Sequence, residues 1–290
     1  MDQKKPPSPH IPQNEPELHA HYAALQTAGE ARDEDMDLAG AALALALLDC
    51  RDQSAAPYHE HLAAIASAVG GACAAAEDIG ARAAALAMVI SGQFGYAGDQ
   101  ENYHDMQNAN LIRVIDRRRG LPVALGILYI LAARAQGWDC AGLNFPGHFL
   151  IRLELGPARR ILDPFNGGGV VEIAQLRRLL KDVAGDGAEL RPEHYQPISD
   201  RDVLLRLLNN IKGRALQADD LPRAAGILLR MRLVSPGTAY LCYEHGAVHA
   251  RLGNVPEAVE AMAACAEQAE DARLRQYAEQ ALKQLRLRMN

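Results

Sequence analysis

The chain has 290 residues and a formal net charge of −6, so it lacks the basic excess that binding to nucleic acid would favour. Hydrophobic residues make up 49% of it but aromatic residues only 5%, which favours helices packed through small side chains. Five scattered cysteines without a CxxC pair, and no signal peptide, predict reduced thiols in the cytoplasm. No apolar run is long enough to cross a membrane, and ten histidines without an HExxH or Cys/His cluster predict neither a metal nor a cofactor.

Residues 1–32 are expected to form a disordered, proline-rich tail, because a polar segment interrupted by prolines cannot bury enough apolar surface to become ordered. Residues 33–91 are expected to form a helical N-terminal region. Its three predicted helices end near Asp49, run from Pro57 to Val69, and run from about Glu77 to Ser91.

Residues 92–198 are expected to form the central core. A glycine-rich stretch (92–99) and a polar loop (102–111) precede a short helix that ends at Gly120. The arginines at 117–119 are either the solvated end of this helix or a binding patch. Pro122 starts a helix to Gln136 that is apolar on every face and is therefore predicted to be buried. A first strand is predicted over residues 138–145, and the glycines at 167–169, which no Lys-Ser/Thr follows, predict a turn and not a phosphate-binding loop.

A β-hairpin is predicted next, and His148 opens its first strand, where residues alternate between two faces. The Gly-Pro pair at 156–157 fits a two-residue turn, which places Glu154 opposite Arg159 in a favourable charge pair. The same register puts Asp163 diagonal to His148 on one face. A histidine beside an aspartate is two thirds of a nucleophilic triad, with the histidine as base and the aspartate holding its tautomer. Both residues are therefore candidate catalytic residues.

Residues 199–290 are expected to form tetratricopeptide-like helical repeats. Segments 219–236 and 253–270 align at an offset of 34, the period of this helix-turn-helix repeat. A closing helix is predicted over residues 273–288. Because two repeats are a short array, they should dock on the preceding domain. The groove of such an array could bind a peptide or helix, or the chain itself could fill it. The aligned pairs are Ala224 with Ala258, Leu228 with Met262, and Met231 with Cys265.

Four motifs in the core carry a resemblance to a known family: GYAGDQENY (95–103), RVIDRRRGLP (113–122), NFPGHF (144–149) and LDPFNGG (162–168). In this order and at these separations they resemble the transglutaminase-like domain of the SirB-type bacterial proteins, which carry tetratricopeptide-like repeats C-terminally. One departure is NANL (108–111), where the family more often has NSYL. The resemblance implies an α+β, mostly α fold. A reduced transglutaminase/papain-like core with a small antiparallel sheet would precede C-terminal tetratricopeptide-like helical hairpins.

The resemblance also implies which residues take part in the reaction. It matches His148 and Asp163 to the family's His and Asp, and it puts the cysteine of active members at the position of Pro122, which cannot be a nucleophile. Residues 92–198 contain no Ser or Thr and one thiol, Cys140. Covalent acyl transfer needs an activated Ser, Cys or Thr beside the base. Cys140 is the one local candidate, but it follows a helix C-terminus, where no helix dipole lowers a thiol pKa, and a small buried thiol is its alternative role.

Two function hypotheses follow. In the first, the chain is a pseudoenzyme: a non-catalytic interaction or regulatory protein that binds a protein or peptide through its cleft or its repeat groove. In the alternative, it is a hydrolase or amide-group transferase that uses His148 and Asp163 with Cys140 or water as the attacking group. The residues expected to line the cleft with this pair are Tyr103, Asn144 and Asn166. A purely structural role, in which the pair keeps the hairpin rigid, is the third reading of the same two residues.

Overall fold

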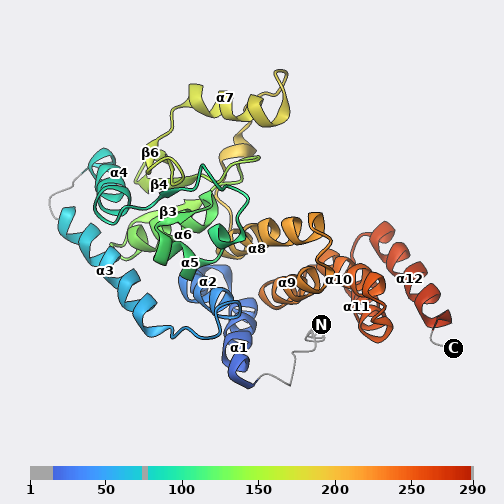
Figure 1. The fold of residues 1–290 in the computed structure, drawn as a ribbon. Helices are drawn as coiled ribbons and strands as arrows, with labels where there is room; N and C mark the ends of the chain where they lie inside the picture. The colour runs from blue at the N-terminus through green and yellow to red at the C-terminus, as the bar shows by residue number, and fades with distance from the viewer. Residues whose placement is uncertain (1–15, 74–77, 289–290) are drawn as a thin grey trace. The chain divides into compact units, whose positions relative to one another are not determined.

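The computed structural model describes residues 16–73 and 78–288, and the chain divides into two compact units. The first unit spans Asp33–Leu207, and the second combines residues 1–32 with Leu208–Asn290. Both consist mainly of helices, and a small antiparallel sheet lies in the first (Figure 1). The mostly helical α+β fold class is confirmed.

The predicted helical region 33–91 lies in the same compact unit as the sheet. Its first long helix begins after Asp37, whose side chain accepts a hydrogen bond from the backbone N–H of Gly40 and so caps the helix. Almost all of that helix is buried. The elements of the region are η1 (Asp33–Asp35), α2 (Leu38–Leu47), α3 (Ala56–Ala72), α4 (Ile79–Ala87) and the π-helix η2 (Met88–Gln93).

Helix α6 (Pro122–Arg134) forms the centre of this unit. It begins with Pro122 in its first turn, where the missing N–H would have no partner anyway, and it is buried over nearly its whole length, as predicted. It packs against α2, α3 and the sheet. The preceding elements are β1 (Ala97–Gly98), η3 (Met106–Ala109), α5 (Leu111–Arg117) and β2 (Arg119–Gly120). The prediction that Gly120 ends the short helix is wrong, because α5 ends at Arg117 and the next residue, Arg118, adopts a left-handed φ of 57°.

The sheet has the strand order β3-β4-β5-β6 and is antiparallel throughout. Its first strand is shorter than predicted, and His148 lies in the loop before β4 instead of opening that strand. The reason is the Pro146-Gly147 pair, in which Gly147 has a φ of 69° that interrupts an extended backbone. The strands are β3 (Asp139–Gly142), β4 (Ile151–Leu155), β5 (Ala158–Asp163) and β6 (Gly169–Val170).

Three further elements complete the first unit: α7 (Ile173–Ala184), η4 (Pro192–Tyr195) and α8 (Asp200–Gln217), which crosses the division between the units. Leu176 and Leu180 of α7 pack in one apolar cluster with Leu143, Phe145 and Leu150. Because these last three residues lie on both sides of His148 in the chain, the cluster anchors the loop that carries the histidine.

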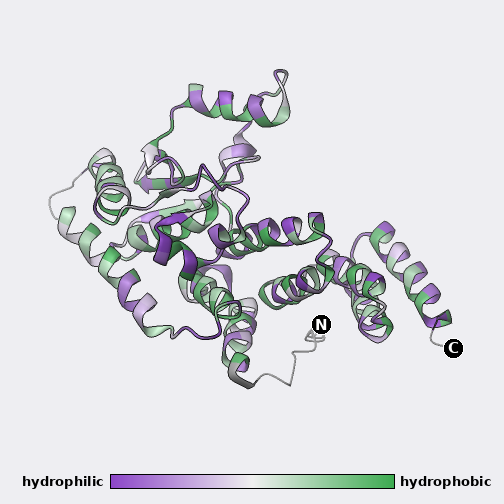
Figure 2. Cartoon of the chain, viewed as in Figure 1, coloured by the Kyte–Doolittle hydropathy of each residue, from purple (hydrophilic) through white to green (hydrophobic). Residues whose placement is uncertain are grey.

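The second unit contains the predicted repeats. Helices α9 (Leu221–Val234) and α11 (Val255–Gln268) begin and end 34 residues apart, and their aligned residues are all buried. The remaining helices are α10 (Ala239–Leu252) and α12 (Ala272–Leu287). In Figure 2, α12 alternates between hydrophilic and hydrophobic residues along its length, as an amphipathic outer helix does. The 34-residue period is confirmed.

Helix α1 (Pro16–Glu30) corrects the expected disordered tail. Residues 16–30 are helical, and α1 packs against α9. Leu18, Tyr22 and Leu25 recur on one face at helical spacing and are buried. Gly29 permits the close approach, because a Cβ there would lie 1.9 Å from the carbonyl oxygen of Leu233. The prediction for residues 1–15 lies outside the described part of the chain.

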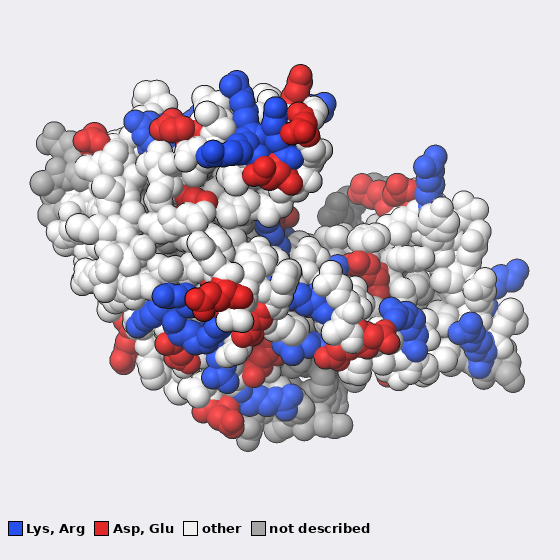
Figure 3. Space-filling view, turned by 45° about the horizontal axis from the view of Figure 1, so that its top comes forward, with Lys and Arg blue, Asp and Glu red and all other residues white. Residues whose placement is uncertain are grey.

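The surface carries mixed charge on the face shown in Figure 3, where acidic and basic side chains are interspersed. Among the helices of residues 16–73 and 78–288, none is both long and apolar enough to span a bilayer.

Candidate functional site

The β4–β5 hairpin has the predicted register. The two-residue loop is the Gly-Pro pair at 156–157, and Glu154 stands opposite Arg159. Arg159 Nε and Glu154 Oε2 are 3.6 Å apart, which is within ion-pair distance. The hairpin places Asp163 at the end of β5, next to the loop that carries His148.

His148 and Asp163 meet at this end of the hairpin. His148 Nε2 lies 3.0 Å from Asp163 Oδ2. The ring nitrogen is buried but is not aligned for a good hydrogen bond, so the contact is mainly electrostatic. The two residues that the sequence paired are therefore in contact.

Asp163 is the centre of a small hydrogen-bond network. Its carboxylate accepts hydrogen bonds from the backbone N–H of Phe165 (3.0 Å) and of Asn166 (3.2 Å), and from Asn166 Nδ2 (2.7 Å). Burial by itself would raise the pKa of Asp163, but the contact with His148 and the donors of Asn166 outweigh it and hold that pKa below its ordinary value. Asp163 is therefore a carboxylate at neutral pH.

Phe165 forms an aromatic wall beside the pair. Its ring meets the His148 ring edge-on at 6.2 Å and the Tyr103 ring at 5.7 Å between centroids. Gly98 makes room for Phe165, since a Cβ at Gly98 would lie 2.4 Å from that ring. Phe165 therefore contacts both His148 and the predicted cleft residue Tyr103.

Arg206 of α8 holds the histidine loop, and sequence reasoning missed it. Its guanidinium donates hydrogen bonds to the carbonyl oxygens of Phe145 (2.6 Å) and His148 (2.7 Å), and it lies 5.6 Å over the Phe149 ring. Burial lowers the pKa of Arg206 from its usual high value. Arg206 is 58 residues from His148 in the chain, so no local sequence pattern predicts this contact.

Tyr129 of α6 is a second residue that the sequence did not reveal. It is buried, and no partner in the described part of the chain hydrogen-bonds its hydroxyl. Burial first, and the negative charge of Asp163 second, raise the pKa of Tyr129, so the phenol stays protonated. Gly168 lies against this phenol, because a Cβ there would be 2.6 Å from the hydroxyl oxygen.

Cys140 does not belong to this site. It lies on β3 opposite Leu153 of β4, and in the described structure no contact joins it to His148. Burial raises the pKa of the Cys140 thiol to about 12, so it is protonated at neutral pH. A buried, protonated thiol fits the alternative role of Cys140, a small buried side chain, better than the role of a nucleophile.

Pro122 is the first residue of α6 and is buried. One turn later, Gly126 lies against the Phe149 ring, since a Cβ at Gly126 would be 2.3 Å from it. The start of α6 is thus close to the segment that carries His148. The remaining predicted cleft residues are both exposed: Asn166 bonds to Asp163, whereas in the described structure the side chain of Asn144 makes no hydrogen bond.

One hydroxyl near the site comes from just outside the stretch that lacks Ser and Thr. Ser91 of η2 approaches the glycine turn, and its Oγ lies 3.2 Å from the position of a Cβ at Gly167. In the described structure, no hydrogen bond joins Ser91 to His148, so the hydroxyl has no base to activate it.

The three arginines at 117–119 act separately, which neither sequence-based reading foresaw. Arg117 forms an ion pair with the buried Asp99 at 3.0 Å, and Arg119 donates to the Gly95 carbonyl. Arg118 stacks 4.8 Å over the Tyr96 ring and also contacts the hydroxyl of that residue. The three arginines therefore hold residues 95–103 against the segment that precedes α6, which is a structural role.

In residues 16–73 and 78–288, no three or more His, Cys, Asp and Glu side chains are grouped so that they could hold a metal ion. What the site offers chemically is a histidine next to a carboxylate, an aromatic wall and a buried phenol.

Relatives of the chain come mainly from bacteria. It is 31% identical over 174 residues to a UPF0162 protein of Xylella fastidiosa strain Temecula1, which is 59% of this chain and 62% of that protein. A UPF0162 protein of Vibrio cholerae is 34% identical over 143 residues, or 49% of this chain and 53% of that protein. Human F-box only protein 21 is 33% identical over 82 residues, 28% of this chain and 13% of that protein. Each match thus covers less than two thirds of the relative's own length.

No solved structure matches the chain. Two family descriptions match it: residues 211–283 match the tetratricopeptide repeat, and residues 56–209 match the transglutaminase-like superfamily. The second match covers more than half of the chain and includes the hairpin, Pro122 and the His148–Asp163 pair. The chain belongs to the transglutaminase-like superfamily.

Proposed function

We propose that this chain is a transglutaminase-like protein without covalent acyl transfer, related to the SirB-type branch, that acts as an interaction or regulatory protein. The proposal rests on which groups surround the His148 ring. Its ring lies against Asp163, and in the described structure no thiol or hydroxyl is hydrogen-bonded to it. Pro122 stands where the resemblance places the nucleophile, and a proline side chain has no atom that can attack a carbonyl.

The retained pair has a second use in this proposal. A carboxylate with a lowered pKa next to an imidazole offers both hydrogen-bond acceptors and a donor at the end of the hairpin. Tyr103 and Phe165 add an aromatic wall beside it. Together these groups suit recognition of a polar segment of a protein or peptide partner.

The repeats supply the other contact surface. Tetratricopeptide repeats generally mediate protein–protein interactions. Two tyrosines on helices of this unit are exposed, Tyr240 (55%) on α10 and Tyr277 (58%) on α12, and exposed tyrosines are common at protein interfaces. We place the partner contact on these helices and the protein in the cytoplasm.

The rival function, a hydrolase or amide-group transferase, loses its protein nucleophile with Cys140, which is buried opposite Leu153. It would have to use water activated by His148. The retained His148–Asp163 contact is the observation that keeps this second candidate testable.

An acyl-transfer assay tests the proposal. The full chain is mixed with an activated ester and with a glutamine-containing protein plus a fluorescent primary amine. Product formation is then compared among the wild type, His148→Ala and Cys140→Ala. Because no nucleophile stands beside the base, we expect all three proteins to match the uncatalysed rate, with no burst of released alcohol.

A burst that His148→Ala and Cys140→Ala both abolish would contradict the proposal and identify a cysteine enzyme. Steady ester hydrolysis without a burst, lost only in His148→Ala, would support the water-based rival. The proposed partner contact on the repeats is tested separately by affinity capture with the full chain. A specific partner should be lost in Tyr240→Ser/Tyr277→Ser. It should be retained in Glu279→Gln, the control at an exposed position.

A further inference from the structure

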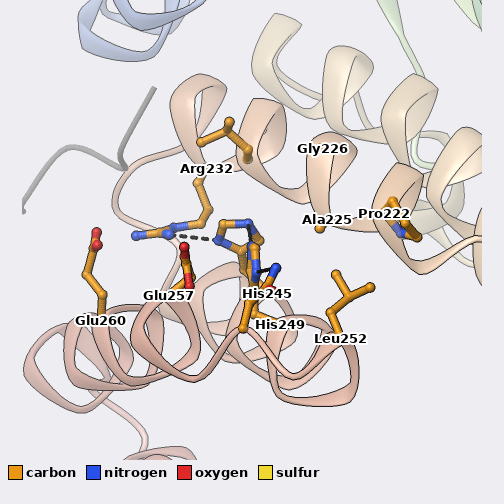
Figure 4. Close-up of a pocket in the computed structure, with 11 residues that line it drawn as sticks. Pro222, Ala225, Gly226, Arg232, His245, His249, Leu252, Glu257 and Glu260 are labelled. Carbon is orange, nitrogen blue, oxygen red and sulfur yellow. Dashed lines mark hydrogen bonds between the residues drawn. The ribbon is translucent and has the colours of Figure 1, made fainter. Parts of the chain in front are cut away.

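A cavity of 460 Å³ lies in the repeat unit between α9, α10 and α11 (Figure 4). Arg232 of α9 and His245 and His249 of α10 lie along it, and the side chains of Glu257 and Glu260 of α11 line its other side. None of these residues belongs to the hairpin site, and sequence reasoning singled out none of them. A volume of several hundred Å³ is enough for a small organic molecule.

The hydrogen bonds of this cluster fix where its protons lie. Arg232 Nη1 is 2.9 Å from His245 Nδ1, and because arginine can only donate, Nδ1 accepts. Burial first, and the charge of Arg232 second, lower the pKa of His245 to about 3, so its ring is neutral and carries its proton on Nε2. The Nε2 atoms of His245 and His249 lie 3.0 Å apart, so both ring nitrogens of His245 face a neighbour within the cluster.

Arg232 itself lacks a counter-charge. It is only 4% exposed, and in the described structure no carboxylate lies within 4.0 Å of its guanidinium. An arginine has five N–H donors, and His245 with the Cys242 sulfur uses only part of them. A buried cation without an opposite charge is unfavourable, so a bound anion would stabilise it. The base of the cavity is therefore suited to a carboxylate.

The rim of the cavity is negatively charged, opposite in sign to Arg232. Glu257 and Glu260 are exposed, and in Figure 4 the guanidinium of Arg232 points to the side of the pocket where these two residues stand. Two carboxylates there would repel a multiply charged anion such as phosphate and attract an ammonium group. The ligand should therefore carry one carboxylate and one ammonium close together.

The opposite end of the cavity is apolar. Pro222, Ala225 and Leu252 line it and lie across the pocket from Glu260 in Figure 4. Leu229 adds a further apolar side chain. Such walls favour an aliphatic or aromatic group.

We propose that this pocket binds a free α-amino acid with an apolar side chain. The carboxylate pairs with Arg232, the ammonium group meets Glu257 and Glu260, and the side chain enters the apolar end. This site is independent of the proposed loss of acyl transfer, because it lies wholly in the repeat unit.

The test is calorimetric titration of the full chain with L-leucine, L-methionine and L-phenylalanine. At least one should bind saturably. L-Leucinamide, which lacks the carboxylate, and 4-methylpentanoate, which lacks the amine, should each bind about tenfold more weakly or worse, because each loses a charged pair. Absence of saturable binding by all three amino acids at millimolar concentration would overturn the proposal. Equal binding of N-acetyl-leucine would also overturn it, since the occupant would then be a peptide C-terminus.

Two sets of variants connect the binding to the named residues. Arg232→Met should abolish binding of the amino acid, whereas Arg251→Met, which removes an exposed arginine of α10, should leave it unchanged. If Arg232→Met fails to fold, the rim variant Glu257→Gln/Glu260→Gln decides, because both residues are exposed. It should weaken leucine binding about tenfold and leave 4-methylpentanoate binding unchanged, with Glu267→Gln on the same helix as the matched control. Unchanged leucine binding in the rim variant would overturn the proposal.

Discussion

Two histidine sites of the described structure have opposite electrostatics. On the hairpin, His148 lies 3.0 Å from the carboxylate of Asp163. In the repeat unit, His245 accepts a hydrogen bond from the guanidinium of Arg232. Burial and the neighbouring cation keep the His245 ring neutral. The first arrangement pairs a histidine with an anion, and the second exposes a cation to an incoming anion.

The difference also concerns what each site lacks. The hairpin site pairs His148 with a carboxylate, but Pro122 occupies the start of α6, and no thiol or hydroxyl of the described residues is hydrogen-bonded to the His148 ring. The repeat pocket has an arginine with no carboxylate beside it in the described part of the chain. In our proposals, the first site lacks a reacting group and the second receives a ligand. Removing the charged partner should therefore have opposite consequences in the two sites.

The largest expected effect comes from Asp163→Ala. This change leaves His148 without its anion and the backbone N–H groups of Phe165 and Asn166 without their acceptor, so we expect a loss of about 3 kcal/mol in the free energy of unfolding. Urea unfolding followed by the fluorescence of Trp138, the one tryptophan of the chain, reports on this unit.

The exposed Asp186→Asn is the matched control and should change the free energy by less than about 0.5 kcal/mol. The Asp163 contribution should also depend on pH. Because the folded pKa lies below the unfolded value of about 3.9, the contribution is complete above that value and disappears as pH falls through the folded pKa. A difference between wild type and Asp163→Ala that persists unchanged to very low pH would contradict the ionised pair.

Arg206→Met should destabilise the histidine loop by about 2 kcal/mol, because two hydrogen bonds from a charged donor to the Phe145 and His148 carbonyls are lost. Hydrogen exchange in residues 143–150 measures this directly, and exchange there should become faster while the repeat helices stay as they are. Arg159→Met, at an exposed position, is the control. Unchanged exchange would show that the apolar cluster alone holds the loop.

The pH dependence of the repeat unit should reveal His245. Its pKa is lowered from 6.5 to about 3, so the unfolded chain binds the extra proton between these values, and stability falls as pH falls through that window. The slope should be about 1 kcal/mol per pH unit, and His245→Asn should remove it. Hydrogen exchange of α9, α10 and α11 from pH 7 to pH 4 makes the measurement, and an unchanged slope in the variant would contradict the neutral buried ring.

The smallest expected effect on stability is that of Arg232→Met. Arg232 is a buried cation with no counter-charge among the described residues, so replacing it with an apolar side chain of similar length should change the free energy of unfolding by less than about 1 kcal/mol. Hydrogen exchange of the same helices measures it. A loss as large as that of Asp163→Ala would mean that Arg232 is a structural residue, and the contrast between the two sites would fail.

The parts of the molecule that follow local periodicity could be predicted. The turn at 156–157 and the pairing of Glu154 with Arg159 follow from alternation and turn chemistry, and the 34-residue repeat follows from counting. Helix α1 was missed because its prolines suggested disorder, although Leu18, Tyr22 and Leu25 already have helical spacing.

The contacts that complete each site could not be predicted in this way. Arg206 and Tyr129 reach the hairpin from helices distant in sequence, and Arg232 meets His245 only through the packing of α9 on α10. Side chains brought together by tertiary packing leave no periodic signal. The same holds for Cys140, whose distance from His148 depends on strand register rather than on proximity in the chain.

The most direct measurement puts a cysteine at position 122, where the resemblance places the nucleophile. In Pro122→Cys, with Cys73 changed to Ser because the other described thiols are buried, the rate of alkylation by iodoacetamide is followed against pH. We predict a thiol at 122 with an apparent pKa at least one unit below the ordinary value of about 8.5, because it lies at a helix N-terminus near His148. His148→Gln in the same background should return it towards that value. An ordinary pKa that does not respond to His148→Gln would contradict the account, because Pro122 would then not stand in the position of the lost nucleophile.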